Sequence, residues 1–251
     1  MAELKLPTEM VSLPSKGLLY PKESPLAKGE IEMKYMTAKE EDILTNSNFI
    51  KQGTVIDKLL QSLIITKIDF NELLIGDKNA ILVAARILGY GADYSFRYVN
   101  TQGQEVDASI DLTSLNEKPI DESLFKNGNN FTFTLPKSGN TITFKLLTQG
   151  DEKKIDAEIK GLQKINPNGS YDITTRLKYM ITSINGDHEQ KSIRDFVDNF
   201  MLAPDARALR EYYAKIQPDI DLKFIPEDEN YTGEGITVPI SLNFFWPDAG
   251  V

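Results

Sequence analysis

Residues 13–21 (LPSKGLLYP) constrain the fold most, because they combine apolar side chains with two prolines and a glycine. Proline and glycine disfavour a helix interior or a central strand, so this segment is predicted to be extended. The prolines also restrict the unfolded chain and so reduce the entropy lost on docking. We expect residues 1–25 to form an extended N-terminal arm on its own domain or on a neighbour. Deletion of residues 1–22 is then expected to leave a folded protein that assembles poorly.

Composition excludes several classes of function. The net charge of −9 and the absence of a Lys/Arg run argue against nucleic-acid binding. The chain has no cysteine, which excludes disulfides, thiolate metal sites and thiol catalysis. The N-terminus lacks the apolar core of a signal peptide, and the longest apolar stretch, residues 80–88, is too short to span a bilayer. We therefore expect a cytoplasmic product without a nucleic-acid or membrane partner.

Hydrophobic periodicity predicts an α+β fold of two small units, residues 26–125 and 126–251. Residues 113–130 are the best linker candidate, because they contain Pro119 and an Asn/Gly-rich run. In the first unit we expect a strand at 30–36, helices at 37–46, 54–65 and 70–75, a helix from an Asp77 N-cap to Gly89, and a hairpin of 94–99 with 106–112. In the second we expect a hairpin of 131–135 with 141–147, helices at 151–165, 173–183, 192–201 and 205–216, and strands at 220–225 and 236–245.

The two halves contain similar segments in the same order. Residues 34–37 (KYMT) correspond to 145–148 (KLLT), and residues 74–77 (LIGD) correspond to 202–205 (LAPD). We predict a pseudo-duplicated chain in which each unit packs helices against short antiparallel hairpins; chance similarity explains the pattern about as well. Residues 135–139 (LPKSG) also resemble 13–17 (LPSKG), and the second copy lacks the residues that follow Gly17. This makes Leu18, Leu19, Tyr20 and Pro21 the stronger candidates for a partner contact.

No constellation of residues indicates chemistry. His188 is the only histidine and lies in a polar run, where its acidic neighbours diverge, so we expect no metal site. The acid pairs 40–41 and 151–152 fall in first helical turns, which favours interaction with the helix dipole over a glycosidase pair. No phosphate-binding loop or nucleophile elbow is present. We predict no catalytic, cofactor-binding or metal-binding residue.

The C-terminal aromatic run is a second candidate for a partner contact. Phe244, Phe245 and Trp246 follow one another, and Trp246 is the only tryptophan. Alternation places Phe244 and Trp246 on one face of a strand and Phe245 on the other. Buried aromatic side chains dominate interface energies, so these residues could anchor a partner. The alternative, that the phenylalanines complete a core strand and Trp246 caps the domain, has equal weight.

Several segments taken together resemble a known family. Residues 13–21, MTAKEE at 36–41, LLIGD at 73–77, RILGYG at 86–91 and FFWP at 244–247 are similar to the baseplate hub proteins of T-even-type contractile-tailed phages. That family includes hub subunits and hub-assembly factors. Its members often carry cysteine pairs between the C-terminal strands and after the middle tyrosines, where this chain has none. The resemblance therefore implies no metal site in this chain.

The resemblance implies a non-enzymatic structural part of the tail baseplate in the virion, in several copies of a symmetric assembly. The partners that it implies are other phage baseplate and tail proteins. An assembly chaperone that is absent from the mature virion is the second hypothesis. A tail-associated glycan hydrolase using Glu40, Glu41, Asp151 and Glu152 is the third, and a host protein with similar segments is the fourth.

Overall fold

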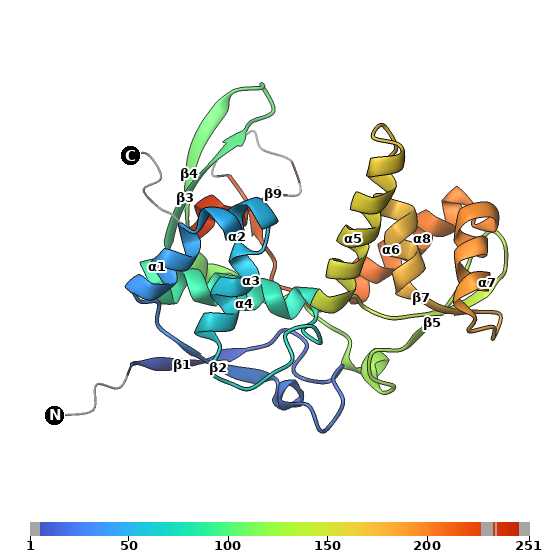
Figure 1. Ribbon diagram of the computed structural model, residues 1–251, viewed down its shortest axis with the longest axis horizontal. Helices are drawn as coiled ribbons and strands as arrows, with labels where there is room; N and C mark the ends of the chain where they lie inside the picture. Colours follow the sequence, from blue (N-terminus) through green and yellow to red (C-terminus); the bar gives the residue numbers. More distant parts are fainter. Residues whose placement is uncertain (1–5, 227–232, 234, 246–251) are drawn as a thin grey trace.

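The computed structural model describes residues 6–226, 233 and 235–245. The chain is α+β, with its helices divided between two clusters along the long axis of the molecule. Figure 1 shows α1–α4 on the left and α5–α8 on the right. The last described strands return to the first cluster, where Phe224 packs edge-on against Phe96 with ring centroids 5.4 Å apart. The second half of the sequence therefore contributes to both ends of the fold.

The first cluster combines a strand pair, four helices and a long hairpin. Its capping box holds the start of α1, because Thr37 and Glu40 bond reciprocally. The buried stripe of α3 consists of Val55, Leu59, Leu60 and Leu63, as helical periodicity predicts. The elements are β1 (Thr8–Ser12), β2 (Glu30–Lys34), α1 (Ala38–Leu44), α2 (Ser47–Gln52), α3 (Val55–Leu63), α4 (Ile75–Tyr90), β3 (Asp93–Val99) and β4 (Glu105–Asp111).

The second cluster is built on a three-stranded antiparallel sheet of order β5-β6-β7. Another capping box, of Thr148 and Asp151, opens its longest helix. A π-helical turn at Phe196–Phe200 follows α7 and leads towards α8. The elements of this cluster are β5 (Phe131–Thr134), β6 (Thr141–Phe144), α5 (Gln149–Ile165), α6 (Asp172–Met180), β7 (Ile181–Ile184), α7 (Gln190–Asp195) and α8 (Ala203–Ile216). Strands β8 (Lys223–Phe224) and β9 (Ile236–Thr237) follow in the chain, pair with each other and lie at the first cluster.

Several local predictions were wrong. No helix forms at residues 70–75, and α4 begins at Ile75 with Leu74 as its N-cap. Asp77 does not cap this helix, because its carboxylate is bound by Ser15 and Tyr20 instead. The predicted strand at 236–245 pairs only at 236–237, and a 3-10 turn at Leu242–Phe245 follows. Strands β1 and β7 and helix α2 were not predicted.

The N-terminal segment differs from the extended arm that was expected. Strand β1 pairs with β2 along its whole length, from Thr8 opposite Lys34 to Ser12 opposite Glu30. The residues that follow form a folded loop with a 3-10 turn at Pro25–Lys28, in which Leu13, Leu19 and Leu26 are buried. This segment lies on its own domain and supplies part of the domain's core.

One contiguous hydrophobic core runs through both clusters. The predicted linker is packed rather than free. Phe125 is buried and meets Phe131 edge-on at 6.0 Å, and the Lys118 amide donates to the Asp219 carbonyl at 2.8 Å. The covalent connection between the two clusters is therefore reinforced by side-chain packing and by backbone hydrogen bonds.

Candidate functional site

The two clusters meet where the segment before α4 pairs with the start of α5. Leu74 lies opposite Thr148 in an antiparallel bridge. The Ile75 amide donates to the Leu147 carbonyl at 3.3 Å, and the Gln149 amide donates to the Leu73 carbonyl at 2.8 Å. We call residues 71–75 and 147–150 the seam. It is an isolated antiparallel bridge, whose two segments we call strands, and it uses the free amide donors at two helix starts.

Glycine makes the close approach at the seam possible. A Cβ added to Gly76 would lie 1.8 Å from the Pro218 carbonyl oxygen, so no other residue fits there. A Cβ on Gly150 would lie 3.0 Å from the Asn71 carbonyl oxygen, and the Gly150 amide donates to that same oxygen at 2.9 Å. Both glycines therefore let the backbones of the two clusters touch.

A polar cluster crosses the seam on one side. Lys78 Nζ lies 2.9 Å from Asp57 Oδ1 and 2.8 Å from Gln149 Oε1, and Gln149 Nε2 donates to Asp57 at 2.9 Å. Lys153 Nζ stands over the ring of Phe70 at 5.4 Å from its centroid. This cluster joins α3 and α4 of the first half to α5 of the second, with every member hydrogen-bonded.

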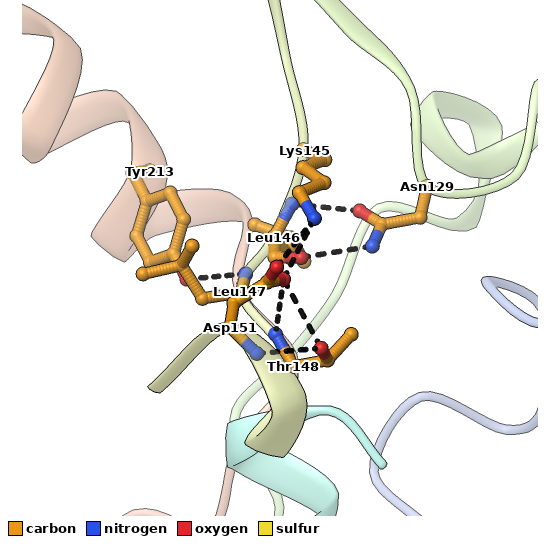
Figure 2. A network of polar contacts seen from close by, with 7 residues as sticks. All are labelled: Asn129, Lys145, Leu146, Leu147, Thr148, Asp151 and Tyr213. Carbon is orange, nitrogen blue, oxygen red and sulfur yellow. Dashed lines mark hydrogen bonds and ion pairs between the residues drawn. The ribbon is translucent and has the colours of Figure 1, made fainter. Parts of the chain in front are cut away.

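A second network holds the start of α5, as Figure 2 shows. Lys145 Nζ bonds both carboxylate oxygens of Asp151, at 2.8 and 2.7 Å. The Leu146 amide donates to Asn129 Oδ1 at 2.7 Å, and the Leu147 amide donates to the Tyr213 hydroxyl at 3.0 Å. Burial raises the pKa of Tyr213 to about 12, so its hydroxyl stays protonated. The strand that enters the seam is therefore fixed from both sides.

Tyr20 and Asp77 fix the other strand of the seam. The Tyr20 hydroxyl donates to Asp77 Oδ2 at 2.6 Å and accepts from the Leu74 amide at 2.9 Å. Ser15 donates to the same carboxylate through its amide at 2.9 Å and its hydroxyl at 2.7 Å. Burial raises the pKa of Asp77 despite these donors, and it also raises the pKa of Tyr20.

A groove of about 830 Å³ opens beside the seam. One wall consists of residues 19–21 with Asn71, Glu72 and Leu74, and the other of Gly128, Asn129 and the first turns of α5. Lys153 and Lys154 project from α5 at this wall and are exposed. The groove thus presents apolar surface with charged side chains at its edge.

The structure brings only part of the predicted contact residues to this groove. Leu19 and Tyr20 line it but are largely buried in the core, at 4% and 8% exposure. Pro21 lines it and is exposed, and Leu18 is 40% exposed. Phe244 and Phe245 are fully buried, and Phe244 packs edge-on against Tyr94 at 4.8 Å. Trp246 lies outside the described residues.

The carboxylates considered for catalysis form structural contacts. Glu40 is buried and accepts from Lys34, Thr37 and Ser62. Burial on its own raises the pKa of Glu40, but these hydrogen bonds outweigh it and lower the pKa to about 2. Asp151 pairs with Lys145, and Glu152 pairs with Arg176. These three carboxylates are thus used in holding a helix start or two neighbouring helices together. The fourth, Glu41, is exposed and accepts from the Tyr90 hydroxyl at 3.3 Å.

His188 is exposed, and its Nδ1 lies 3.1 Å from the Thr182 carbonyl oxygen. Within residues 6–226, 233 and 235–245, no three metal-ligating side chains gather at one point. The same part of the chain contains no helix with the length and hydrophobicity needed to cross a membrane. The groove beside the seam is therefore the main candidate site in the described structure.

Sequence reasoning did not find most of this site. The groove residues Asn71, Glu72, Asn129 and Lys154 carry no motif, because the seam joins segments more than seventy residues apart. Two glycines, at positions 76 and 150, were the available signal. Each is the second residue of a helix, where a glycine indicates close backbone approach.

One comparison with known proteins gives a match that spans most of the chain. The chain matches a family model described as T4 bacteriophage base plate protein, over residues 12–202. The match begins at the end of β1 and includes both strands of the seam and the groove. No curated protein and no solved structure matches the chain. Because the matched region covers most of its length, the chain belongs to the T4 bacteriophage base plate protein family.

Proposed function

We propose that this protein is a structural subunit of the hub region of a contractile tail baseplate, and that it acts by binding other baseplate and tail proteins. Membership of the baseplate family carries this proposal. The groove beside the seam supports it, because it offers apolar surface with a charged edge on a well-braced framework. The subunit is made and assembled in the host cytoplasm and stays in the virion.

Composition of purified particles tests this role. Mass spectrometry of intact tails is expected to find the protein in a fixed ratio to other baseplate subunits. Its presence in assembly intermediates and absence from mature particles would instead identify an assembly chaperone. Absence from both would contradict any role in the baseplate.

The groove is the proposed contact for another baseplate protein. Pro21 and Lys154 stand on its opposite walls and are exposed, so Pro21→Asp and Lys154→Glu should leave folding intact. Complementation of a phage that lacks the gene is expected to fail or fall at least about tenfold with these variants, since interface anchors typically cost over 1 kcal/mol. Lys51→Glu, on the exposed face of α2, is the matched control and should complement fully.

A non-enzymatic role is part of the proposal. Glu40 and Asp151 are each engaged by a lysine at the start of a helix, which gives both carboxylates a structural use. Purified protein is expected to release no soluble fragments from bacterial cell wall above a buffer control. Measurable hydrolysis that disappears in the Glu152→Gln variant would overturn this part.

We also infer that the two clusters are copies of one duplicated unit. In each, an aspartate in the first turn of a helix binds the backbone of a Leu-Pro turn. Ser15 donates to Asp77 at 2.9 Å, and Lys137 donates to Asp205 at 2.7 Å. These aspartates are the third residues of α4 and α8, whose N-cap residues share an extended backbone.

Two further correspondences fall in the same order along the chain. A lysine at a strand end pairs with the acid of a capping box in both halves, Lys34 with Glu40 and Lys145 with Asp151. The residue after a helix bridges back to the strand before it in both halves: Ile64 to Met33, and Ile181 to Phe144. Superposing residues 26–115 on 138–245 of an experimental structure is expected to reproduce this order. A different strand order would exclude duplication.

A further inference from the structure

The duplicated arrangement gives each strand of the seam a counterpart elsewhere in the chain. Leu74 precedes α4 as its N-cap, and Leu202 precedes α8 with nearly the same backbone angles, ψ 147° and 143°. Residues 199–203 therefore correspond to residues 71–75. In the same way, Thr148 and Thr37 are the N-cap threonines of α5 and α1, and both lie in a capping box. Residues 36–39 therefore correspond to residues 147–150.

Neither counterpart segment is bridged to another segment within the described structure. Leu74 is 4% exposed because residues 147–150 pair across it, whereas Leu202 is 44% exposed. Phe200, beside it, is 64% exposed. The amides of Ala203 and Ala38 have no hydrogen-bond partner in the described part of the chain. The chain therefore contains a second copy of each strand of the seam, and these two copies are not paired with each other.

We propose that residues 36–39 of one copy pair with residues 199–203 of a second copy and repeat the internal seam between molecules. This inference rests on the relation between the two halves proposed above. The contact joins two different surfaces, so it is heterologous and propagates head to tail. Helices α1 and α7 lie at opposite ends of the long axis, which allows the contact to repeat without a clash within one molecule (Figure 1).

The internal seam specifies which bonds the contact makes. The Ile75 amide bonds Leu147 and the Gln149 amide bonds Leu73, so the Ala203 amide pairs with the Met36 carbonyl and the Ala38 amide with the Met201 carbonyl. Gly150 allows one more bond, to Asn71, through a close approach. Lys39 stands at the corresponding place, and its Cβ would crowd the facing carbonyl and lengthen that bond.

The contact between molecules is weaker than the internal seam. Ala206 and Ala38 stand where Lys78 and Gln149 stand, so the polar cluster that crosses the internal seam has no equivalent. The internal seam also forms within one chain, so it does not lose the translational and rotational entropy that association of two molecules costs. Association is therefore expected only at high protein concentration in solution and to be favoured where other baseplate proteins hold the copies together.

Sedimentation velocity of the full chain at concentrations up to about 100 µM tests this pairing, in a range where weak specific contacts are populated. The weight-average mass is expected to rise continuously with concentration. Leu202→Asp should abolish the rise, because it places a charge opposite Thr37. Ala38→Pro should also abolish it: proline suits the first position of a helix but removes the donor. Ile165→Asp, at another exposed apolar position, is the control and should associate like the wild type.

Mixing the two variants decides the orientation. Leu202→Asp keeps an intact 36–39 segment, and Ala38→Pro keeps an intact 199–203 segment. Each alone should be monomeric, whereas the mixture should form a 1:1 dimer and nothing larger. A wild type that stays monomeric up to about 100 µM, or a mixture that stays monomeric, would overturn the proposal. Both readouts use purified protein, so they are independent of whether the subunit is found in virions.

Discussion

Asp77 and Asp205 occupy the same position in α4 and α8, yet their surroundings shift their pKa values in opposite directions. Asp205 accepts from the amides of Lys137 and Ser138; burial alone would raise its pKa, but these donors lower it below the usual value. Asp77 is enclosed by Ser15 and Tyr20, and burial raises its pKa. The residues that follow Gly17 make the difference, because only the first half has Tyr20 to close the site. Both carboxylates are buried, so the same motif holds a charged aspartate in the second half and, in the first half, an aspartate whose burial favours the neutral form.

Removal of residues 1–22 tests how far the first half depends on its N-terminal segment. We expect loss of cooperative folding, because the deletion removes β1 and the buried Leu13, Leu19 and Tyr20. Circular dichroism during a thermal melt measures this. Loss of the thermal transition would contradict the expectation, drawn from the sequence, that the truncated protein stays folded. A retained sharp transition would show that the segment only lies on the surface.

Leu13 and Leu135 begin the Leu-Pro turns of the two halves, and both are buried. Leu13→Ala and Leu135→Ala should each cost about 2–5 kcal/mol, as expected for large-to-small changes in a packed core. Urea denaturation measures both free energies of unfolding. Nearly equal losses of stability would support the equivalence of the two Leu-Pro turns. A negligible loss at either site would show that the two turns are not equivalent.

The ion pairs Lys34–Glu40 and Lys145–Asp151 differ in exposure, so we expect them to contribute differently to the free energy of unfolding. Glu40→Gln leaves Lys34 without an anion at a buried site and should cost about 2–3 kcal/mol. Asp151→Asn acts on the more exposed Lys145 and should cost about 1 kcal/mol. Because the pKa of Glu40 is lowered to about 2, its contribution is present above the usual pKa and fades as the pH falls towards 2. Equal costs in denaturation curves would contradict this ranking.

Alanine at the two aspartates is expected to give opposite pH dependence. Each substitution should cost about 1–3 kcal/mol at neutral pH, because backbone or hydroxyl donors lose their acceptor. The cost of Asp205→Ala should shrink as the pH falls below about 4, since a lowered pKa gives stability that acid removes. The raised pKa of Asp77 has the opposite effect, so the cost of Asp77→Ala should increase as the pH falls towards the usual carboxyl pKa of about 4.

Denaturation at a series of pH values, from about 7 to about 2, measures both aspartate variants against the wild type. Parallel pH dependences for the two variants would show that the enclosure by Tyr20 does not distinguish the sites.

The smallest effects on stability are expected from the two tyrosines whose hydroxyls hydrogen-bond to the seam. Tyr20→Phe removes a donor to Asp77 and the acceptor of the Leu74 amide, and Tyr213→Phe removes only the acceptor of the Leu147 amide. We expect costs of about 2 and about 1 kcal/mol. Hydrogen exchange of the Leu74 and Leu147 amides should rise selectively in the matching variant. Unchanged exchange would mean that the hydroxyls do not protect the seam.

The sequence by itself determined the local elements with strong periodicity or caps. The stripe of α3, the capping boxes of α1 and α5 and the hairpin of β3 with β4 depend on nearby residues, so pattern and propensity were sufficient. The sequence alone also excludes disulfides and thiol catalysis, because the chain has no cysteine. The family resemblance to phage baseplate proteins also followed from the sequence segments.

Only the tertiary structure decided where the prolines, aspartates and aromatic residues act. The segment at 13–21 became part of the core because Asp77, sixty residues away, binds its backbone. Residues 71–74 form no helix because the backbone of this segment pairs with 147–150, a choice no local pattern can reveal. The groove depends on the same long-range pairing. Contacts between distant residues decide such features, because their energy appears only once the chain has closed the loop between them.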